Sequence, residues 1–297
     1  MIVDLQGVTQ HNEGPRFLWS IIVSHRRIHL DIYGAIYHRR STRDFEPDPL
    51  GPRELAKVRM AVENRRRLDD SGASGITLVE EGQQLQKRLS GVIADYGKVE
   101  APHYLIATSR ESDLHLYDIG YSLEEVVLNL TDRGIGTCWI GKGFNDEELR
   151  KLVDLPENQT PRVLIAFGLP SGKDSFDRID QPSRKDLDHF LIDEKADEFN
   201  ERKSKLIDAL RRAPSAINGQ PWRVSFGQDK VELYIQPRSR LTRMLINKMM
   251  AMNKIDGGIG LCHLEVAAKR FWDKVKVQFS ASRSRKGLIY VGSLSLG

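Results

Sequence analysis

Hydrophobic and polar residues follow one another along the chain in patterns that predict a mixture of helices and short strands. Apolar residues spaced three and four apart predict amphipathic helices, and short apolar runs such as VLIAFG and LIYVG predict strands. The expected helices are residues 31–38, 52–65, 83–93 and 116–133, with a further amphipathic run at 199–212. The expected strands are residues 103–108, 137–140, 163–168, 231–236 and 288–292. Because these elements do not form regular strand–helix–strand units, the pattern indicates an α+β fold.

The first 30 residues differ from the rest of the chain, because they show no sustained periodicity. Two explanations are open: they form an extension on the surface, or translation naturally starts at Leu30, since bacterial leucine codons can initiate. Further along, the charged stretch DEKADEFN at 193–200 is the best candidate for a linker. We therefore divide the chain into an extension (1–30), a first half (31–192), a linker (193–200) and a second half (201–297).

The two halves share a short pattern. The stretch YDIGYSL at 117–123 recurs as IDGGIGL at 255–261, and each is expected to open an amphipathic helix that is followed by an apolar strand. An Asp near a helix start is favoured by the helix dipole, and small residues one turn apart allow two helices to come close. The ordered recurrence suggests a diverged duplication whose helices pack against each other.

Charge and composition narrow the class of protein. The net charge of +4 combines a basic second part, with 19 Lys and Arg against 7 Asp and Glu in residues 201–297, and an acidic first part. The basic residues do not form runs or alternate with aromatic residues, so we expect no nucleic-acid partner. The longest apolar stretch is too short for a membrane span. Two distant cysteines, Cys138 and Cys262, predict a cytoplasmic protein with reduced thiols and no metal site.

Three polar stretches stand out, and each has an ordinary structural explanation when it is taken alone. HRRSTRDF at 38–45 could be a solvated basic helix end. GIGTCWIG at 134–141 could be a turn and a strand end, and APSAINGQPW at 213–222 could be a structural turn. Together they resemble the nitroreductase family of flavin enzymes, with its Arg-Arg-Ser-x-Arg-x-Phe, glycine-bounded strand and Pro-Ser-x-x-Asn-x-Gln-Pro-Trp signatures. The resemblance extends from about Asp31 to the C-terminus.

The order of these stretches departs from the family. Its members carry the Pro-Ser-x-x-Asn segment about thirty residues after the Arg-Arg-Ser segment, whereas here it comes about 170 residues later, and LDDSGASGITLVEEG occupies the expected place. In the family, the site is shared by the two subunits of a symmetric dimer. The resemblance therefore implies a nitroreductase-like fold of two similar halves, in which one chain imitates the family homodimer and keeps one flavin site. A small subgroup of the family has this single-chain arrangement.

The resemblance also implies which residues bind the cofactor, flavin mononucleotide (FMN). Arginines suit a phosphate because the guanidinium is planar and permanently charged. The first half is expected to hold the phosphate, and backbone N–H groups at the end of the strand are expected near the reactive edge of the ring. The second half is expected to hydrogen-bond the ring or the ribityl chain. The cofactor-binding residues implied in this way are Arg39, Arg40, Ser41, Arg43, Trp139, Ile140, Gly141, Lys142, Arg184, Pro214, Ser215 and Asn218. One alternative stays open, because Lys185 could take the place of its neighbour Arg184.

No side chain is assigned a catalytic role, because in such enzymes the flavin carries the chemistry. Pro221 and Trp222 are expected to pack in the core, and the histidines at 103, 115, 189 and 263 are interpreted as structural. The implied activity is transfer of hydride from NAD(P)H to FMN and then to a small acceptor, such as a nitroaromatic or quinone-like compound. Two alternatives stay open: a flavin-binding protein without turnover, or a family member that acts on flavin or on a halogenated aromatic. We expect a monomer or a weak homo-oligomer.

Overall fold

The computed structural model describes residues 31–83, 85, 99–112, 114–141, 144–172, 183–195, 199–237, 243–279, 284–285 and 287–297. The predicted extension 1–30, most of the predicted helix 83–93 and the middle of the linker lie outside these ranges.

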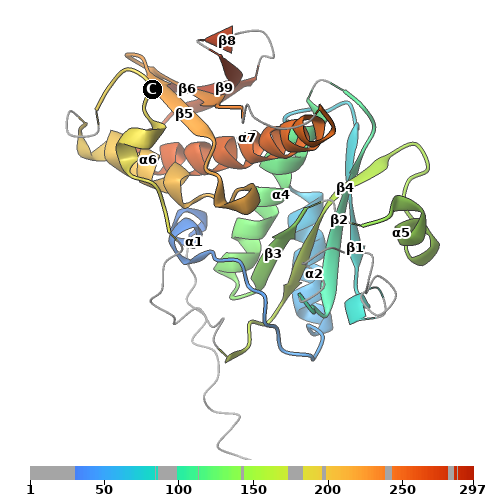
Figure 1. The fold of residues 1–297 in the computed structure, drawn as a ribbon. Helices are drawn as coiled ribbons and strands as arrows, with labels where there is room; N and C mark the ends of the chain where they lie inside the picture. Colours follow the sequence, from blue (N-terminus) through green and yellow to red (C-terminus); the bar gives the residue numbers. More distant parts are fainter. Residues whose placement is uncertain are drawn as a thin grey trace, which may run out of the picture.

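The described strands form two antiparallel sheets with the same strand order (Figure 1). The first has the order β1-β2-β4-β3 and consists of β1 (Ser74–Val79), β2 (His103–Ser109), β4 (Thr160–Gly168) and β3 (Gly136–Ile140). The second has the order β5-β6-β9-β7, with β5 (Trp222–Phe226), β6 (Lys230–Ile235), β9 (Leu288–Leu296), β7 (Val275–Phe279) and the short β8 (Ser284–Arg285) paired with β9. β3 and β7 lie at corresponding ends of the two orders, and each is the first strand after a long helix, α4 (His115–Asp132) or α7 (Arg243–Phe271).

Two long helices, α4 (His115–Asp132) and α7 (Arg243–Phe271), cross between the sheets (Figure 1). The other helices are α1 (Ile32–His38), α2 (Pro52–Glu63), α5 (Asp146–Leu152), α6 (Glu201–Arg212) and the 3-10 turns η2 (Leu187–Phe190) and η4 (Ala216–Asn218). Nine predicted elements are confirmed, and most of their ends lie within a few residues of the predicted ends. These elements are α1, α2, α4, α6, β2, β3, β4, β6 and β9. The α+β prediction is confirmed as well.

The crossing of α4 and α7 depends on the glycines of the repeated stretch. A Cβ on Gly120 of α4 would overlap the carbonyl oxygen of Ile255, and a Cβ on Gly258 of α7 would overlap that of Tyr117. The two contacts are reciprocal, because Tyr117 and Gly120 correspond to Ile255 and Gly258 in the aligned repeats. Such reciprocity is the property of a two-fold interface. The predicted close packing of these helices is thus confirmed.

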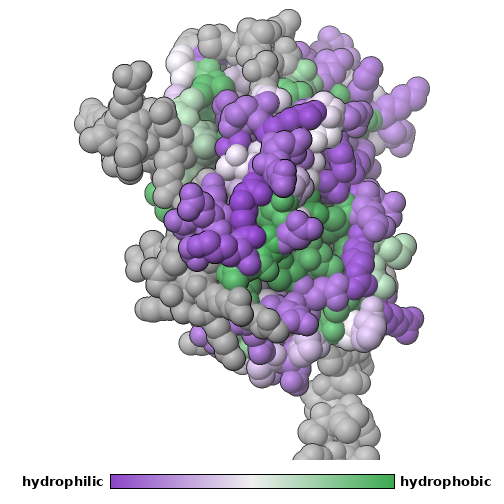
Figure 2. Space-filling view, turned by 90° about the vertical axis from the view of Figure 1, so that its right-hand side faces the viewer, coloured by the Kyte–Doolittle hydropathy of each residue, from purple (hydrophilic) through white to green (hydrophobic). Residues whose placement is uncertain are grey.

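The two sheets are buried differently. In β2 and β4, alternate residues enter two separate apolar clusters: Leu105 and Ile165 face α2 and α4, whereas Ile106 and Leu164 face α5. Burial on both faces explains why these strands read as unbroken apolar runs. In β6, only alternate residues enter the cluster around α7, so this strand alternates in polarity. On the face shown in Figure 2, hydrophobic surface gathers in the middle and hydrophilic residues surround it.

One expectation about the repeats is wrong. Asp118 does lie in the first turn of α4, but Asp256 lies in the interior of α7 and not at a helix start. The reason is that good helix formers such as Leu, Met and Lys precede Asp256, so the helix already begins at Arg243. The carboxylate of Asp256 instead accepts a hydrogen bond from the backbone N–H of Ala216 at 3.0 Å.

Among the residues that the structure describes, no helix combines the length and the apolar character needed to cross a membrane. Within the same ranges, no group of three or more His, Cys, Asp or Glu side chains is arranged to hold a metal ion.

The buried His103 makes stability depend on pH. Its Nε2 accepts a hydrogen bond from the backbone N–H of Leu50 at 2.8 Å, and its Nδ1 lies 2.6 Å from the carbonyl oxygen of Glu80, so the folded protein needs the neutral ring. Burial accordingly lowers the pKa of His103 below its ordinary 6.5. As the pH falls below 6.5, the unfolded chain binds a proton that the folded chain resists, and stability is lost down to the folded pKa.

We therefore expect a lower melting temperature at pH 5 than at pH 7.5. The decrease should be smaller in His103→Gln, whose amide oxygen can still accept from Leu50. Melting curves of both proteins across this range measure the difference. Equal decreases would show that His103 is not the responsible group.

Candidate functional site

The Arg-Arg-Ser segment follows α1 and runs beside the start of β3. Ser41 forms a parallel bridge with Thr137, and the backbone N–H of Thr42 donates to the carbonyl oxygen of Thr137 at 2.9 Å. This approach requires a glycine at 136, because a Cβ there would lie 2.6 Å from Thr42 Oγ1. The structure therefore joins the first two signature stretches into one unit.

Arg39 lies at the C-terminal end of α1, with its side chain only 2% exposed. Its Nε is 3.9 Å from Oε1 of the buried Glu124 and has no hydrogen-bond partner among the described residues. Burial lowers the pKa of Arg39, and the nearby Glu124 opposes this effect. A buried guanidinium that is paired only at a distance is suited to an anionic ligand.

Glu124, on the buried side of α4, also contacts a predicted site residue and the other half. Its Oε2 accepts from Nε1 of Trp139 at 2.9 Å, and its Oε1 lies 2.9 Å from Nε2 of His263 on α7. Nδ1 of His263 is 2.9 Å from the carbonyl oxygen of Ala209 on α6. The side chains of Glu124 and His263 are both fully buried. This carboxylate therefore links the Arg-Arg-Ser segment, β3 and the second half.

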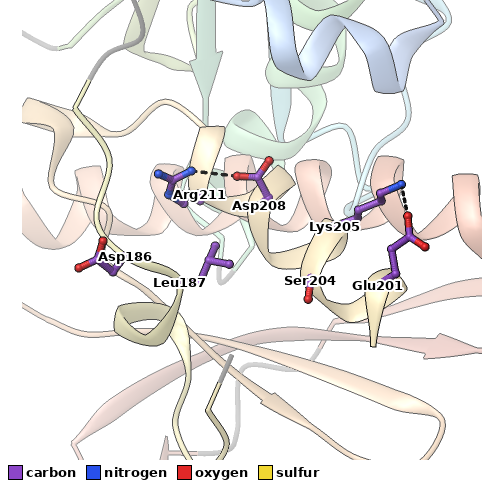
Figure 3. A pocket seen from close by; sticks show the side chains of 7 residues that line it. All are labelled: Asp186, Leu187, Glu201, Ser204, Lys205, Asp208 and Arg211. Carbon is purple, nitrogen blue, oxygen red and sulfur yellow. Dashed lines mark hydrogen bonds and ion pairs between the residues drawn. The ribbon is translucent and has the colours of Figure 1, made fainter. Parts of the chain in front are cut away.

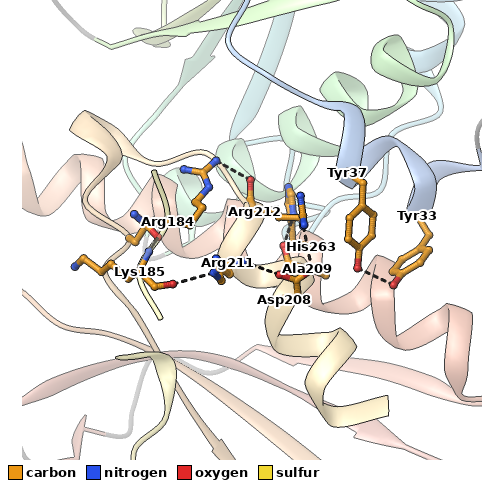
Figure 4. Close-up of polar contacts among 10 residues, drawn as sticks. Tyr33, Tyr37, Arg184, Lys185, Asp208, Ala209, Arg211, Arg212 and His263 are labelled. Carbon is orange, nitrogen blue, oxygen red and sulfur yellow. Dashed lines mark hydrogen bonds and ion pairs between the residues drawn. The ribbon is translucent and has the colours of Figure 1, made fainter. Parts of the chain in front are cut away.

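The structure brings Arg184 of the first half into direct contact with Asn218 of the second. Arg184 Nη1 donates to Asn218 Oδ1 at 2.5 Å. Its Nη2 donates to the carbonyl oxygen of Arg212 at 3.0 Å (Figure 4). Burial, together with the positive charges of Arg39, Arg211 and Arg212, lowers the pKa of Arg184 to about 10. A guanidinium with this pKa is still charged at neutral pH, so four positive charges gather at this corner. The carboxylates of Asp208, paired with Arg211 and Arg212, and of Glu124, near Arg39, balance them only in part, and the remaining positive charge favours binding of an anion.

The corner is held by contacts between α1, α6 and the 183–186 segment. Arg212 lies over the ring of Tyr37, 4.4 Å from its centroid, and Tyr37 hydrogen-bonds Tyr33 at 2.8 Å (Figure 4). Arg211 Nε donates to the carbonyl oxygen of Lys185 at 2.8 Å. These contacts fix the C-terminal ends of the two helices side by side, next to Arg39.

The Pro-Ser-x-x-Asn loop is anchored to α7 through Asp256. Besides the Ala216 contact, Nε1 of the buried Trp222 donates to the Asp256 carbonyl oxygen at 2.6 Å, so the packing role predicted for Trp222 is confirmed. Within the loop, Ser215 Oγ accepts from the backbone of Gln220 at 2.9 Å. Three of its residues that are not glycine have positive φ: Ile217 at 47°, Asn218 at 53° and Gln220 at 49°. Such backbone strain is typical of ligand-binding sites.

The remaining predicted residues are less closely gathered. Gly141 directly follows β3, and the nearest atom to a Cβ placed on it would be Cε of Met252 on α7, at 3.9 Å. The Ile140 side chain packs in the cluster on the α5 side of the sheet, so only its backbone could serve a ligand at this corner. Pro214 is buried and Arg40 is half-buried. Arg43 is exposed, and its Nη1 donates to the carbonyl oxygen of Ser41 at 3.4 Å. Lys142 lies outside the described residues.

A separate cavity of about 450 Å³ lies beside α6 and η2 (Figure 3). Four of its charged side chains form two ion pairs: Lys205 with Glu201 at 2.7 Å and Arg211 with Asp208 at 2.9 Å. The lining consists of Asp186, Leu187, Glu201, Ser204, Lys205, Asp208 and Arg211. Since none of the predicted cofactor residues belongs to it, this cavity is not the site that the sequence predicts.

Sequence reasoning missed Glu124, Arg211 and Arg212, and it took His263 for an isolated structural histidine. One signal was available for Glu124: it lies four residues after Gly120 and four before Leu128, in the buried stripe of α4. A carboxylate at such a position needs buried partners. The basic residues at the end of α6 are ordinary for a helix terminus, so no sequence feature distinguishes them.

Comparison with known proteins identifies relatives of this arrangement. The family described as "Putative TM nitroreductase" matches residues 31–268. The crystal structure of a "putative nitroreductase" from Thermotoga maritima is similar over 92% of this chain and 97% of its own, with a TM-score of 0.63 and 20% identity. No match is found among curated proteins.

Shorter matches cover about half of the chain. A nitroreductase from Bacteroides fragilis, solved with bound FMN, matches 53% of this chain and 95% of its own, with a TM-score of 0.44 and 19% identity. A nitroreductase family protein from Clostridium novyi matches 48% of this chain and 87% of its own, with a TM-score of 0.42 and 22% identity.

Proposed function

The chain belongs to the nitroreductase family, and from this premise we propose that it is an FMN-dependent oxidoreductase that takes hydride from NAD(P)H and reduces a small acceptor. The acceptor would be a compact, electron-poor compound such as a nitroaromatic or a quinone. One observation carries the proposal: Arg184 and Asn218, predicted to bind one cofactor from two halves of the chain, are hydrogen-bonded to each other beside the buried Arg39.

The residues at this corner fit the cofactor. FMN ends in a phosphate dianion, and the corner offers the guanidinium groups of Arg39 and Arg184 with Arg211 and Arg212 nearby. The buried Nε of Arg39, which has no hydrogen-bond partner among the described residues, supplies a donor for such an anion. A phosphate would also offset the mutual repulsion of these positive charges.

The predicted residues would then share three tasks. Arg39, Arg40, Ser41, Arg43 and Arg184 would hold the phosphate. Trp139, Ile140, Gly141 and Lys142 would line the edge of the ring, where backbone N–H groups at the end of β3 would stabilise the reduced form. Pro214, Ser215 and Asn218 would cover the ring or the ribityl chain from the second half. Bound FMN would supply the hydride chemistry, while the protein binds, orients and excludes water.

The proposal includes a single-chain imitation of the family homodimer. Three features support it: the equal strand order of the two sheets, the reciprocal contacts at Gly120 and Gly258, and two equivalent loop anchors. Asp256 holds the loop at Ala216, and Asp118 accepts from the backbone N–H of Leu68 at 2.6 Å in the corresponding loop of the first half. That loop reads LDDSGAS and lacks Pro, Asn and Trp, so one site remains.

Anaerobic titration tests the activity. We expect the purified protein to be yellow, and its flavin absorbance should bleach when NADH or NADPH is added without oxygen. A panel of nitroaromatic, quinone, free-flavin and halogenated acceptors should then restore the colour selectively. A bound flavin that neither coenzyme reduces would indicate storage or sensing instead of turnover. A protein that binds no FMN would contradict the proposal.

A further inference from the structure

The fully buried pair of Glu124 and His263 is the strongest unexplained feature next to the proposed phosphate corner. We propose that His263, although it belongs to the second half, is a positioning residue for the phosphate site: it neutralises Glu124 and so leaves the charge of Arg39 available to the ligand. This inference rests on the proposed FMN site.

Geometry decides the protonation of the pair. Nδ1 of His263 faces the carbonyl oxygen of Ala209, which can only accept, so this nitrogen carries a proton. The other nitrogen is 2.9 Å from a Glu124 oxygen, so one proton lies between them. Glu124 also accepts from Trp139 and faces Arg39, and both contacts favour the ionised carboxylate. The pair is therefore an imidazolium and a carboxylate.

The distances show how the pair acts on Arg39. His263 and Trp139 occupy the oxygens of Glu124 at hydrogen-bond distance, whereas Arg39 Nε stays at 3.9 Å. Arg39 and the His263 imidazolium are positive and Glu124 is negative, so the three groups together carry one positive charge in excess. This excess lies on Arg39, which is close enough to Arg184 to lower the pKa of Arg184. Without the imidazolium, Glu124 would draw Arg39 into a direct ion pair and cancel that surplus.

Charge-matched variants test this account. We expect H263Q to weaken the affinity for FMN by about 10-fold, while the affinity for riboflavin, which lacks the phosphate, stays the same. The double variant E124Q/H263Q removes both charges, so it should recover most of the lost FMN affinity, and E124Q alone should lose less than H263Q. The control is H103Q, which changes an equally buried histidine in the first sheet and should leave both affinities unchanged.

A measurement on the free protein separates this inference from the proposed function. In ¹⁵N spectra at pH 7 of the flavin-free protein, His263 should be protonated at both ring nitrogens in the wild type and at only one in E124Q. A singly protonated His263 in the wild type would overturn the inference. The inference would also be overturned if E124Q/H263Q bound FMN as weakly as H263Q does, or if H263Q lost as much affinity for riboflavin as for FMN. If the wild type bound no FMN, the proposed function would fail. The protonation of His263 would still be decided by the ¹⁵N spectra, and the charge available at Arg39 by the increase in melting temperature that inorganic phosphate causes.

Discussion

Replacing Gly258 with alanine is expected to destabilise the protein by more than about 3 kcal/mol, at the upper end of what overpacking costs. The new Cβ would overlap the carbonyl oxygen of Tyr117 and would lie 2.6 Å from the backbone nitrogen of Tyr121, so α4 and α7 could not keep their distance. Since backbone atoms cannot turn aside as a side chain does, the two halves would have to separate. The melting temperature should fall by roughly 10 °C or more.

Gly227→Ala provides the matched control. Gly227 also belongs to the second half, but a Cβ on it would meet only the Cβ of Lys230 and a carbonyl oxygen, both at 3.7 Å. Its melting temperature should stay within a few degrees of the wild type. If Gly258→Ala melted like this control, the close crossing of α4 and α7 would be wrong.

Replacing Arg39 with alanine is expected to weaken FMN binding by roughly 10- to 100-fold, because a charge-assisted contact contributes about 1.5 to 3 kcal/mol. The Arg39 side chain is also buried beside Glu124. We therefore expect a modest decrease in the stability of the free protein as well, limited because Glu124 keeps His263 and Trp139. Arg53→Ala, at an exposed position on α2, should change neither quantity.

Asn218→Ala should weaken the same flavin, although it lies in the other half. The structure adds a second effect, because the Asn218 side chain accepts from Arg184 and donates to the carbonyl oxygen of Ser183 at 2.9 Å. The loop should therefore lose stability too. Calorimetric FMN titrations and melting curves of the flavin-free variants separate the two effects. A lower melting temperature with unchanged FMN affinity would identify the loop as a structural turn only.

The sequence was sufficient for elements whose pattern is local. The apolar runs of β2 and β4 and the amphipathic α2 and α6 carry their own periodicity, so their positions were predictable. β1 and β5 were missed because they mix small, polar and apolar residues. Their place at the end of each sheet follows from pairing with β2 and β6, which a single sequence does not reveal.

The candidate site was predictable where three residues or more form a signature, as in HRRSTRDF and APSAINGQPW. It was not predictable where its parts meet only through the fold. Glu124 and His263 are 139 positions apart in the chain, and only the crossing of α4 and α7 brings them together. The charge balance around Arg39 depends on this contact between Glu124 and His263, so it could not be predicted from the composition or from the spacing of residues along the chain.

The stoichiometry of FMN binding tests the central claim, a single flavin site built from both halves of one chain. Titration of the flavin-free protein at known concentration, with its mass in solution measured in the same samples, gives the number of FMN molecules per chain and the assembly that binds them. The account predicts one FMN per chain, with an affinity that does not change when the protein is diluted as a monomer. Two FMN molecules per chain, or binding only by a dimer, would contradict it.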